Sequence, residues 1–228
     1  MRRLIFTDVH ANQPAMEAVL KDAGQWDEAL FLGDIIGWGP HPKQCVELLY
    51  DMNAVRVLGN HDLSCCVRRS NWIWDAWTYD QLSDSMRQWV LDCPERYATC
   101  FADKKTVLMH RAAGTSVYLN PSIAPATMAA AFGESDADIL LCGHSHHGIE
   151  RLWQGKQYLC IRAVGQMRDG DPKTGYTIEE DGRFVHYRVP YDVERVVYDL
   201  NAVGLEEEFK NRWSAFLRTA YDVDWSRL

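Results

Sequence analysis

The chain has 228 residues, of which 47% are hydrophobic and 25% are charged, so its length and composition fit one globular domain with a sizeable core. Its formal net charge is -8. Because a protein that binds long nucleic acids is expected to be basic, this charge argues against DNA or RNA as a partner. No apolar stretch approaches the ~20 residues of a membrane-spanning helix, and no signal segment follows Met1, so we expect a cytoplasmic protein without a membrane partner.

The first sixty residues predict three buried strands that alternate with two helices. The strands correspond to three short apolar runs, at residues 4–6, 29–32 and 54–58. Asn12 and Pro14 are typical of the start of a helix, and Pro42 begins the second helix. This alternation predicts a parallel sheet covered by helices, and the ligands of such sheets bind beyond the carboxyl ends of the strands.

Residues 63–95 interrupt the alternation with a helical insert that is rich in tryptophan. The rings are Trp72, Trp74, Trp77 and Trp89. Because the insert follows a polar cluster at residues 59–62, its rings could stack on a nucleobase at a site there, or could simply bury the insert against the sheet.

From residue 97 onward the pattern favours strands. They are expected around residues 97–101, 106–109, 139–142, 149–153, 157–161, 176–179 and 183–189. We expect an alanine-rich helix over 123–132 and a helical tail, whose apolar stripe of Leu205, Phe209 and Trp213 fits either the core or a homodimer contact. Since no linker or repeat divides the chain, we predict a single α/β domain over 1–228, with the insert at about 63–95 and the tail at about 193–228.

The seven cysteines are odd in number and form no Cys-x-x-Cys pair. Cys142 and Cys160 lie within apolar runs, where an unpaired cysteine behaves as a small hydrophobic residue. We therefore expect free, buried thiols in a reducing compartment rather than a disulfide framework.

Residues with metal-ligand chemistry follow the apolar runs that predict strands. They are Asp8, His10, Asp34, Asn60, His110, His144 and His146. Asp8 and His10 are two residues apart, so both can face one way at the end of an extended strand, and the last pair repeats this spacing. Carboxylate oxygens and imidazole nitrogens that converge on one point form the ligand set of paired divalent metals, which usually catalyse phosphoester chemistry.

Asp34 and Asn60 have separate roles in such a centre. Two metals about 3.5–4 Å apart need a shared anionic ligand, and Asp34, which follows Gly33, is the candidate bridge. Asn60 would supply a neutral oxygen, which avoids excess negative charge where an anionic substrate enters. Gly33, Gly59 and Gly143 would permit the close backbone approach that this cluster requires.

Taken in chain order, these motifs resemble the calcineurin-like metallophosphoesterase superfamily, and most closely its small bacterial and archaeal phosphodiesterase-like branch. The motifs are Asp8-Val9-His10-Ala11-Asn12, Gly33 to Pro40, Gly59-Asn60-His61-Asp62, Gly143-His144-Ser145-His146, Val164 to Pro172 and Val189 to Asp192. The resemblance runs from residue 3 to about 193. It implies a four-layer α-β-β-α sandwich, in which two mixed sheets pack face to face with helices outside.

The resemblance also implies how the ligands are divided. One metal would be held by Asp8, His10, Asp34 and His146, and the other by Asp34, Asn60, His110 and His144. His61 would donate a proton to the leaving oxygen, and Asp62 would orient its imidazole. The donor set contains no thiolate, so we favour Mn²⁺, with Fe, Ni and Zn also suited to it.

These assignments predict a metal-dependent phosphoesterase. A hydroxide that bridges the two ions would attack phosphorus in line, and the substrate would be a small phosphodiester, a nucleotide or a dinucleoside polyphosphate. Two alternatives stay open, a protein serine/threonine phosphatase and a non-catalytic scaffold on the same fold. The shape of the substrate groove would distinguish a protein phosphatase from an enzyme for small phosphoesters. Metal content and turnover would distinguish a scaffold from an enzyme.

Two positions depart from the pattern of the relatives. The relatives carry His-Gly where this chain has His110-Arg111. Arg111 could either reach the substrate phosphate or face solvent. The run from Cys160 to Ala163 replaces an Asn-Pro-Gly-Ser segment, which affects the expected substrate preference more than catalysis. Arg168 is a second candidate substrate ligand, with a purely structural loop as its alternative. The physiological substrate, the native metal and the oligomeric state are not predicted.

Overall fold

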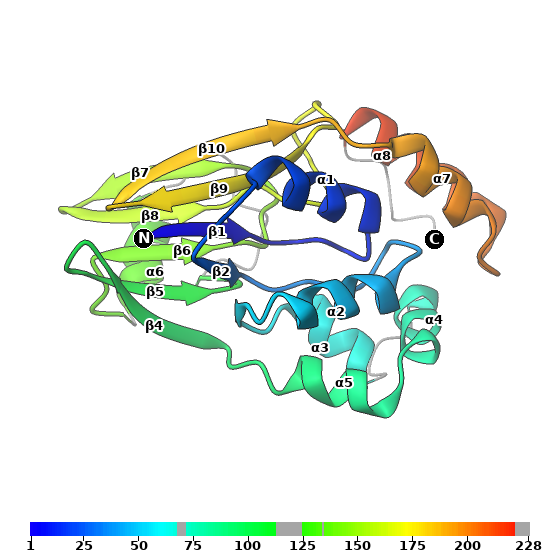
Figure 1. Ribbon diagram of the computed structural model, residues 1–228, viewed down its shortest axis with the longest axis horizontal. Helices are drawn as coiled ribbons and strands as arrows, with labels where there is room; N and C mark the ends of the chain where they lie inside the picture. Colours follow the sequence, from blue (N-terminus) through cyan, green and yellow to red (C-terminus); the bar gives the residue numbers. More distant parts are fainter. Residues whose placement is uncertain (68–71, 113–124, 134, 222–228) are drawn as a thin grey trace.

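The structure is a computed structural model that describes residues 1–67, 72–112, 125–133 and 135–221. The described residues form two five-stranded sheets with helices around them (Figure 1). This arrangement confirms the predicted fold class.

The first sheet has the strand order β10-β9-β1-β2-β3. Its strands are β1 (Arg2–Phe6), β2 (Glu28–Phe31), β3 (Val55–Arg56), β9 (Thr174–Glu180) and β10 (Arg183–Val189). The pairs β1–β2 and β2–β3 are parallel, whereas β9 is antiparallel to both of its neighbours. The carboxyl ends of β1, β2 and β3 therefore lie at one edge of this sheet, as the alternating pattern predicted.

The second sheet has the strand order β4-β5-β6-β8-β7. Its strands are β4 (Arg96–Phe101), β5 (Lys104–Met109), β6 (Ile139–Cys142), β7 (Ile149–Trp153) and β8 (Lys156–Cys160). The three central strands, β5, β6 and β8, are parallel, and antiparallel strands flank them. Polar residues that follow β5 and β6 consequently emerge at the same edge.

Successive side chains of a strand point to opposite faces of its sheet and therefore belong to different cores. In β1, Leu4 and Phe6 belong to a core shared with helices α1 (Gln13–Ala23) and α2 (Pro42–Asp51), whereas Ile5 belongs to the core between the two sheets. In β6, Leu140 packs toward α6 (Pro125–Gly133), and Leu141 packs toward the first sheet. This two-residue periodicity buries both faces of each sheet and produces the four layers.

Local sequence signals explain the helix boundaries. The Asn12 side chain accepts a hydrogen bond from the N–H of Ala15 at 3.1 Å, and Pro14 lies in the first turn of α1, as predicted. The third strand is shorter than the predicted run 54–58. Helix α3 (Asn60–Val67) begins at a predicted ligand, so it starts before the expected insert. The first two residues of the helix expected over 123–132 lie outside the described residues.

The insert continues with α4 (Ile73–Gln81) and α5 (Asp84–Leu91). The tail forms α7 (Val193–Asn201) and α8 (Glu207–Thr219), which lie at the same end of the molecule as α4 (Figure 1). The ring centres of Phe209 in α8 and Trp74 in α4 are 3.9 Å apart. The predicted stripe on the tail is buried in a core that also contains Trp74 of the insert. Cys142 and Cys160 are buried, as expected. Among the described residues, no helix combines the length and apolar character needed to cross a bilayer.

Candidate metal centre

All seven predicted donors lie within the described ranges, and the backbone at five of them is left-handed. The five φ angles are 52° at Asp8, 48° at His10, 60° at Asp34, 69° at His144 and 63° at His146. Non-glycine residues adopt this region rarely, at a cost of about 1–3 kcal/mol each, and such residues concentrate at functional sites. The fold therefore accepts backbone strain at the positions that bring these side chains together.

Two glycines explain how the loops approach so closely. A Cβ atom at Gly59 would lie 2.0 Å from Oδ1 of Asp34, so any side chain there would displace the predicted bridge. Gly33 has a φ of 96°, and its Cβ would lie 2.8 Å from Nδ1 of His110. These clashes support the role predicted for the glycines.

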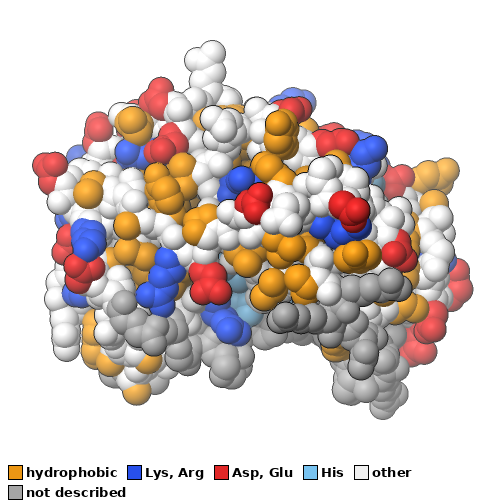
Figure 2. Space-filling model, turned by 90° about the horizontal axis from the view of Figure 1, so that it is seen from below, with side chains coloured by type: hydrophobic (Ala, Val, Ile, Leu, Met, Phe, Trp, Pro, Cys, Tyr) orange, Lys and Arg blue, Asp and Glu red, His pale blue; other side chains and the backbone are white. Residues whose placement is uncertain are grey.

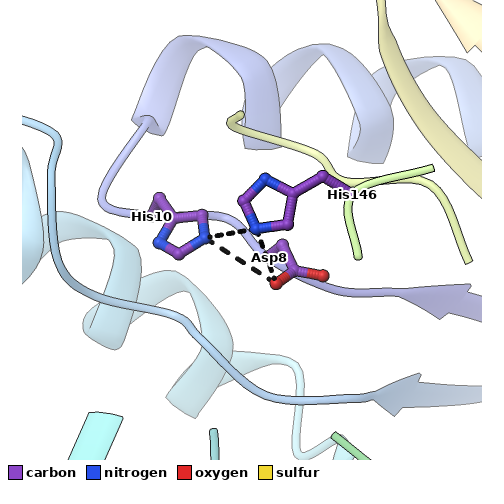
Figure 3. Close-up of side chains that lie close together, drawn as sticks. All are labelled: Asp8, His10 and His146. Atoms are coloured by element: carbon purple, nitrogen blue, oxygen red, sulfur yellow. Dashed lines mark hydrogen bonds and ion pairs between the residues drawn. The ribbon is translucent and has the colours of Figure 1, made fainter. Parts of the chain in front are cut away.

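One group of donors comes from the loops after β1 and β6. Nε2 of His146 lies 3.2 Å from Nε2 of His10 and 3.3 Å from Oδ1 of Asp8. Figure 3 shows the three side chains pointing toward one another. Nδ1 of His146 lies 2.6 Å from the carbonyl oxygen of Gln166, and because a carbonyl can only accept, Nδ1 carries the proton. In the neutral ring, Nε2 therefore presents a lone pair to this group.

The second group involves residues that follow β2, β3, β5 and β6. Nδ1 of His110 donates to the carbonyl of Leu32 at 2.8 Å, which leaves Nε2 as the ligand atom. This Nε2 lies 3.0 Å from Oδ1 of Asn60 and 3.2 Å from Oδ2 of Asp34. Nδ1 of His144 lies 2.9 Å from the same Asn60 oxygen. Nitrogen and oxygen ligand atoms again converge.

Asp34 lies between the two groups. Its Oδ2 is 3.2 Å from Nε2 of His110 and 3.9 Å from Nε2 of His10. Among the described residues, three groups of side chains each bring their ligand atoms within 4.8 Å of one another, and Asp34 belongs to two of these groups. The three groups are Asp8, His10 and His146; His10, Asp34 and His61; and Asp8, Asp34 and His110.

The chemistry of this cluster fits divalent cations. Oδ1 of Asp8 is buried and has no hydrogen-bond partner among the described residues, and Nε2 of His10 and Nε2 of His146 face it at 3.7 and 3.3 Å. A buried polar atom without a partner costs about 1–3 kcal/mol, so several facing acceptors are unfavourable unless a cation lies among them. Oxygen and imidazole ligands without thiolate suit Mn, Fe, Ni or Zn ions.

The pKa shifts in the cluster show which predicted ligands are already in the form that binds a metal ion. Burial alone would raise the pKa of Asp34, but the charges of His110 and His61 outweigh it and lower the pKa below its ordinary value. Burial lowers the pKa of His144 to about 4, and the charge of His110 adds to this shift. Near neutral pH the Asp34 carboxylate is therefore charged and the His144 imidazole is neutral, which are the forms that bind metal ions. Although burial lowers it, the charge of Asp34 raises the pKa of His110 to about 9, so His110 must give up a proton when it binds a metal ion.

Asp62 holds the loop of the candidate bridge rather than the imidazole of His61. Its two buried oxygens accept hydrogen bonds from four backbone N–H groups, at distances between 2.8 and 3.3 Å. The donors belong to Asp34, Ile35, Ile36 and Gly59. The expectation that Asp62 orients the ring of His61 is therefore wrong for this structure. Burial and the charge of Asp34 raise the pKa of Asp62 to about 7, against the effect of these donors.

The ring of His61 is contacted by Trp38 instead. The indole N–H of Trp38 donates to Nε2 of His61 at 3.3 Å, and the two ring centres are 5.8 Å apart. The His61 ring also lies edge-on to His10, with centres 5.1 Å apart. Sequence reasoning missed Trp38, although it lies within the motif Gly33 to Pro40, four residues after Asp34.

The two predicted substrate arginines differ in position. Arg168 is half-buried, and its Nε lies 3.4 Å from Nδ1 of His146, directly beside the cluster. Its guanidinium also lies 5.7 Å from the ring centre of Phe216 in α8. Arg111 is exposed and follows the buried His110. On the face shown in Figure 2, histidine side chains are visible in a notch of the surface, with hydrophobic and charged side chains around them.

Comparisons with known proteins agree with this geometry. A family model described as the calcineurin-like phosphoesterase superfamily domain matches residues 1–182. An uncharacterised protein of Methanocaldococcus jannaschii is 30% identical over 220 residues, covering 84% of this chain and 88% of its own length.

Two solved structures are similar along nearly the whole chain. The metallophosphoesterase from Sphaerobacter thermophilus is 31% identical with a TM-score of 0.79, covering 94% of this chain and 98% of its own. A hypothetical protein from Pyrococcus horikoshii has a TM-score of 0.83 at 14% identity, covering 97% of this chain and 99% of its own, and shows the fold alone.

Proposed function

Because the chain belongs to the calcineurin-like phosphoesterase superfamily, and is a metal-dependent phosphoester hydrolase of that class, we propose that it hydrolyses a small phosphoester at a pair of divalent ions. The observation that carries the proposal is the convergence of facing acceptor atoms on Asp34. Oδ2 of this residue is within 4 Å of imidazole nitrogens from both groups of donors.

Asp34 is the residue that both ions share in this proposal. One ion would be held by Asp8, His10, Asp34 and His146, and the other by Asp34, Asn60, His110 and His144. The hydrogen bonds from His110 to Leu32 and from His146 to Gln166 support this division, because they fix which ring nitrogen faces the cluster.

When bound, the ions supply a nucleophile from water near neutral pH and neutralise charge on the phosphate oxygens. His61 donates a proton to the leaving oxygen as an imidazolium, in which both ring nitrogens carry protons, so Trp38 then holds the ring by packing against it rather than through its indole N–H. Arg168, beside His146, binds a phosphate oxygen through its guanidinium, and Arg111 binds at the rim. Asp62 keeps the carboxylate of Asp34 aimed at the centre by fixing the backbone of its loop.

We propose Mn²⁺ as the activating ion and a small phosphodiester, nucleotide or dinucleoside polyphosphate as the substrate. Fe, Ni and Zn also fit the donor set. Because every ligand and His61 are present, a scaffold that has lost its catalytic residues is disfavoured.

The test is metal content together with turnover. Protein stripped with a chelator is reloaded with Mn²⁺, and its metal content is measured by elemental analysis beside its rate on bis-p-nitrophenyl phosphate. We expect two ions per chain and a rate that returns only with metal. A loaded protein that holds two ions but hydrolyses no phosphoester would support the scaffold. A stripped protein with the full rate would refute metal dependence.

A further inference from the structure

An exposed aromatic surface lies on the His61 side of the centre. Trp72, at the start of α4, keeps 51% of its surface exposed, and its ring centre is 6.4 Å from that of Trp38. Trp38 in turn contacts His61. The three rings lie next to one another in a row, with interplanar angles of 61° between His61 and Trp38 and 53° between Trp38 and Trp72. The row begins at the proposed proton donor and ends at the exposed Trp72. We call this row of His61, Trp38 and Trp72 the aromatic wall.

The inner part of the aromatic wall is held rigidly. Trp38 stacks on Trp213 with ring centres 5.3 Å apart and an interplanar angle of 26°, and Phe209 lies parallel at 6.3 Å. Both of these rings are buried in α8. Since its support does not depend on a ligand, this part of the wall is ready for binding before substrate arrives.

The outer part of the aromatic wall is apolar and open. Ile73, beside Trp72, is 46% exposed, and Leu63, two residues after His61, is 39% exposed. They lie on α4 and α3, which pack against each other. Large apolar side chains that remain exposed beside a reactive centre are typical of a ligand-binding surface.

We propose that this wall binds a nucleobase, so that the substrate is a phosphoester with a nucleoside on the leaving-group side. The inference rests on the proposed function, because the phosphate must lie at the metal centre. His61 protonates the departing oxygen, so the group attached to that oxygen leaves along Trp38 and Trp72. A flat ring stacks on exposed tryptophan at a gain of about 1–3 kcal/mol per base, whatever the base.

The experiment measures competitive inhibition of bis-p-nitrophenyl phosphate hydrolysis by Mn-loaded protein. The inhibitors are adenosine monophosphate, which carries a base, and glycerol phosphate, which does not. The variants are Trp72→Ala, Trp72→Phe, which keeps a flat ring, and Tyr198→Ala, which removes an aromatic side chain that is 76% exposed on α7. Metal content is measured for each variant.

We expect Trp72→Ala to raise the inhibition constant of adenosine monophosphate about 10-fold or more, without changing that of glycerol phosphate. Trp72→Phe should keep most of the nucleotide binding, and Tyr198→Ala should change neither constant. An equal loss for both inhibitors, or no loss for either, overturns the nucleobase assignment while leaving the proposed function intact. Loaded parent protein that hydrolyses no phosphoester refutes the proposed function, and the inference with it.

Discussion

Replacing Asp62 by Asn separates the two roles that this residue can have. The substitution keeps the shape of the side chain but converts one acceptor oxygen into an NH₂ group. Whichever oxygen is converted, two backbone N–H groups then face a donor instead of an acceptor, either those of Ile35 and Ile36 or those of Asp34 and Gly59. The loop that carries the proposed bridge loses its anchor.

The expected cost follows from these hydrogen bonds. Each bond to a charged acceptor contributes about 1.5–3 kcal/mol, so two of them amount to about 3–6 kcal/mol. Burial and the charge of Asp34 raise the pKa of Asp62 to about 7, so removing the charge returns part of this free energy. We expect the free energy of unfolding to fall by about 2–4 kcal/mol, with reduced metal content.

The assay is urea unfolding of chelator-treated protein, with metal content measured separately on loaded protein. Asp75→Asn is the matched control, because Asp75 is also buried but accepts from Sγ of Cys65 rather than from a loop. The control should lose less stability and keep its metals. If Asp62→Asn unfolds like the parent, keeps both ions and loses only the turnover of substrates with poor leaving groups, Asp62 acts on His61 after all.

Three further substitutions test the centre itself. Asp34→Asn removes the bridging charge and should abolish turnover of bis-p-nitrophenyl phosphate while lowering metal content, whereas Asp136→Asn, on the surface, should do neither; retention of both ions and the full rate would contradict the bridge. His61→Gln should keep the metals and slow esters with poor leaving groups most, and equal losses for good and poor leaving groups would argue against a proton donor. Trp38→Ala removes the ring that packs against His61, so kcat for poor leaving groups should fall by up to about 10-fold without loss of metal; an unchanged kcat would show that this ring does not position His61.

Much of the centre could be predicted because its residues are placed by local sequence. Asp8 and Asp34 each lie two residues after a short apolar run, and parallel strands necessarily end at the same edge of a sheet. Gly33 and Gly59 were recognisable as positions where a side chain would not fit. The sequence pattern therefore predicted donor side chains that the structure brings together, such as Asp8, His10 and His146.

The residues that orient the catalytic groups could not be predicted in this way. Asp62 accepts from a loop 28 residues earlier in the chain, and nothing local distinguishes this from a contact with the neighbouring His61. Trp38 and Trp213 stack on each other although most of the sequence lies between them. From the sequence alone, a tryptophan in the apolar stripe of a helix is equally compatible with a dimer contact. Such contacts depend on how distant elements pack.

The predicted metal donors come from both sheets, so the order in which the sheets fold and dock decides when the centre can form. Asp8, Asp34 and Asn60 follow strands of the first sheet, whereas His110 and His146 follow strands of the second, and 136 residues separate His10 from His146. The proposed centre would therefore be complete only after both sheets have docked, and incorporation of metal would belong to the last stage of folding. Ions bound there would cross-link the two sheets, and a chelator should then loosen the whole sandwich from this edge.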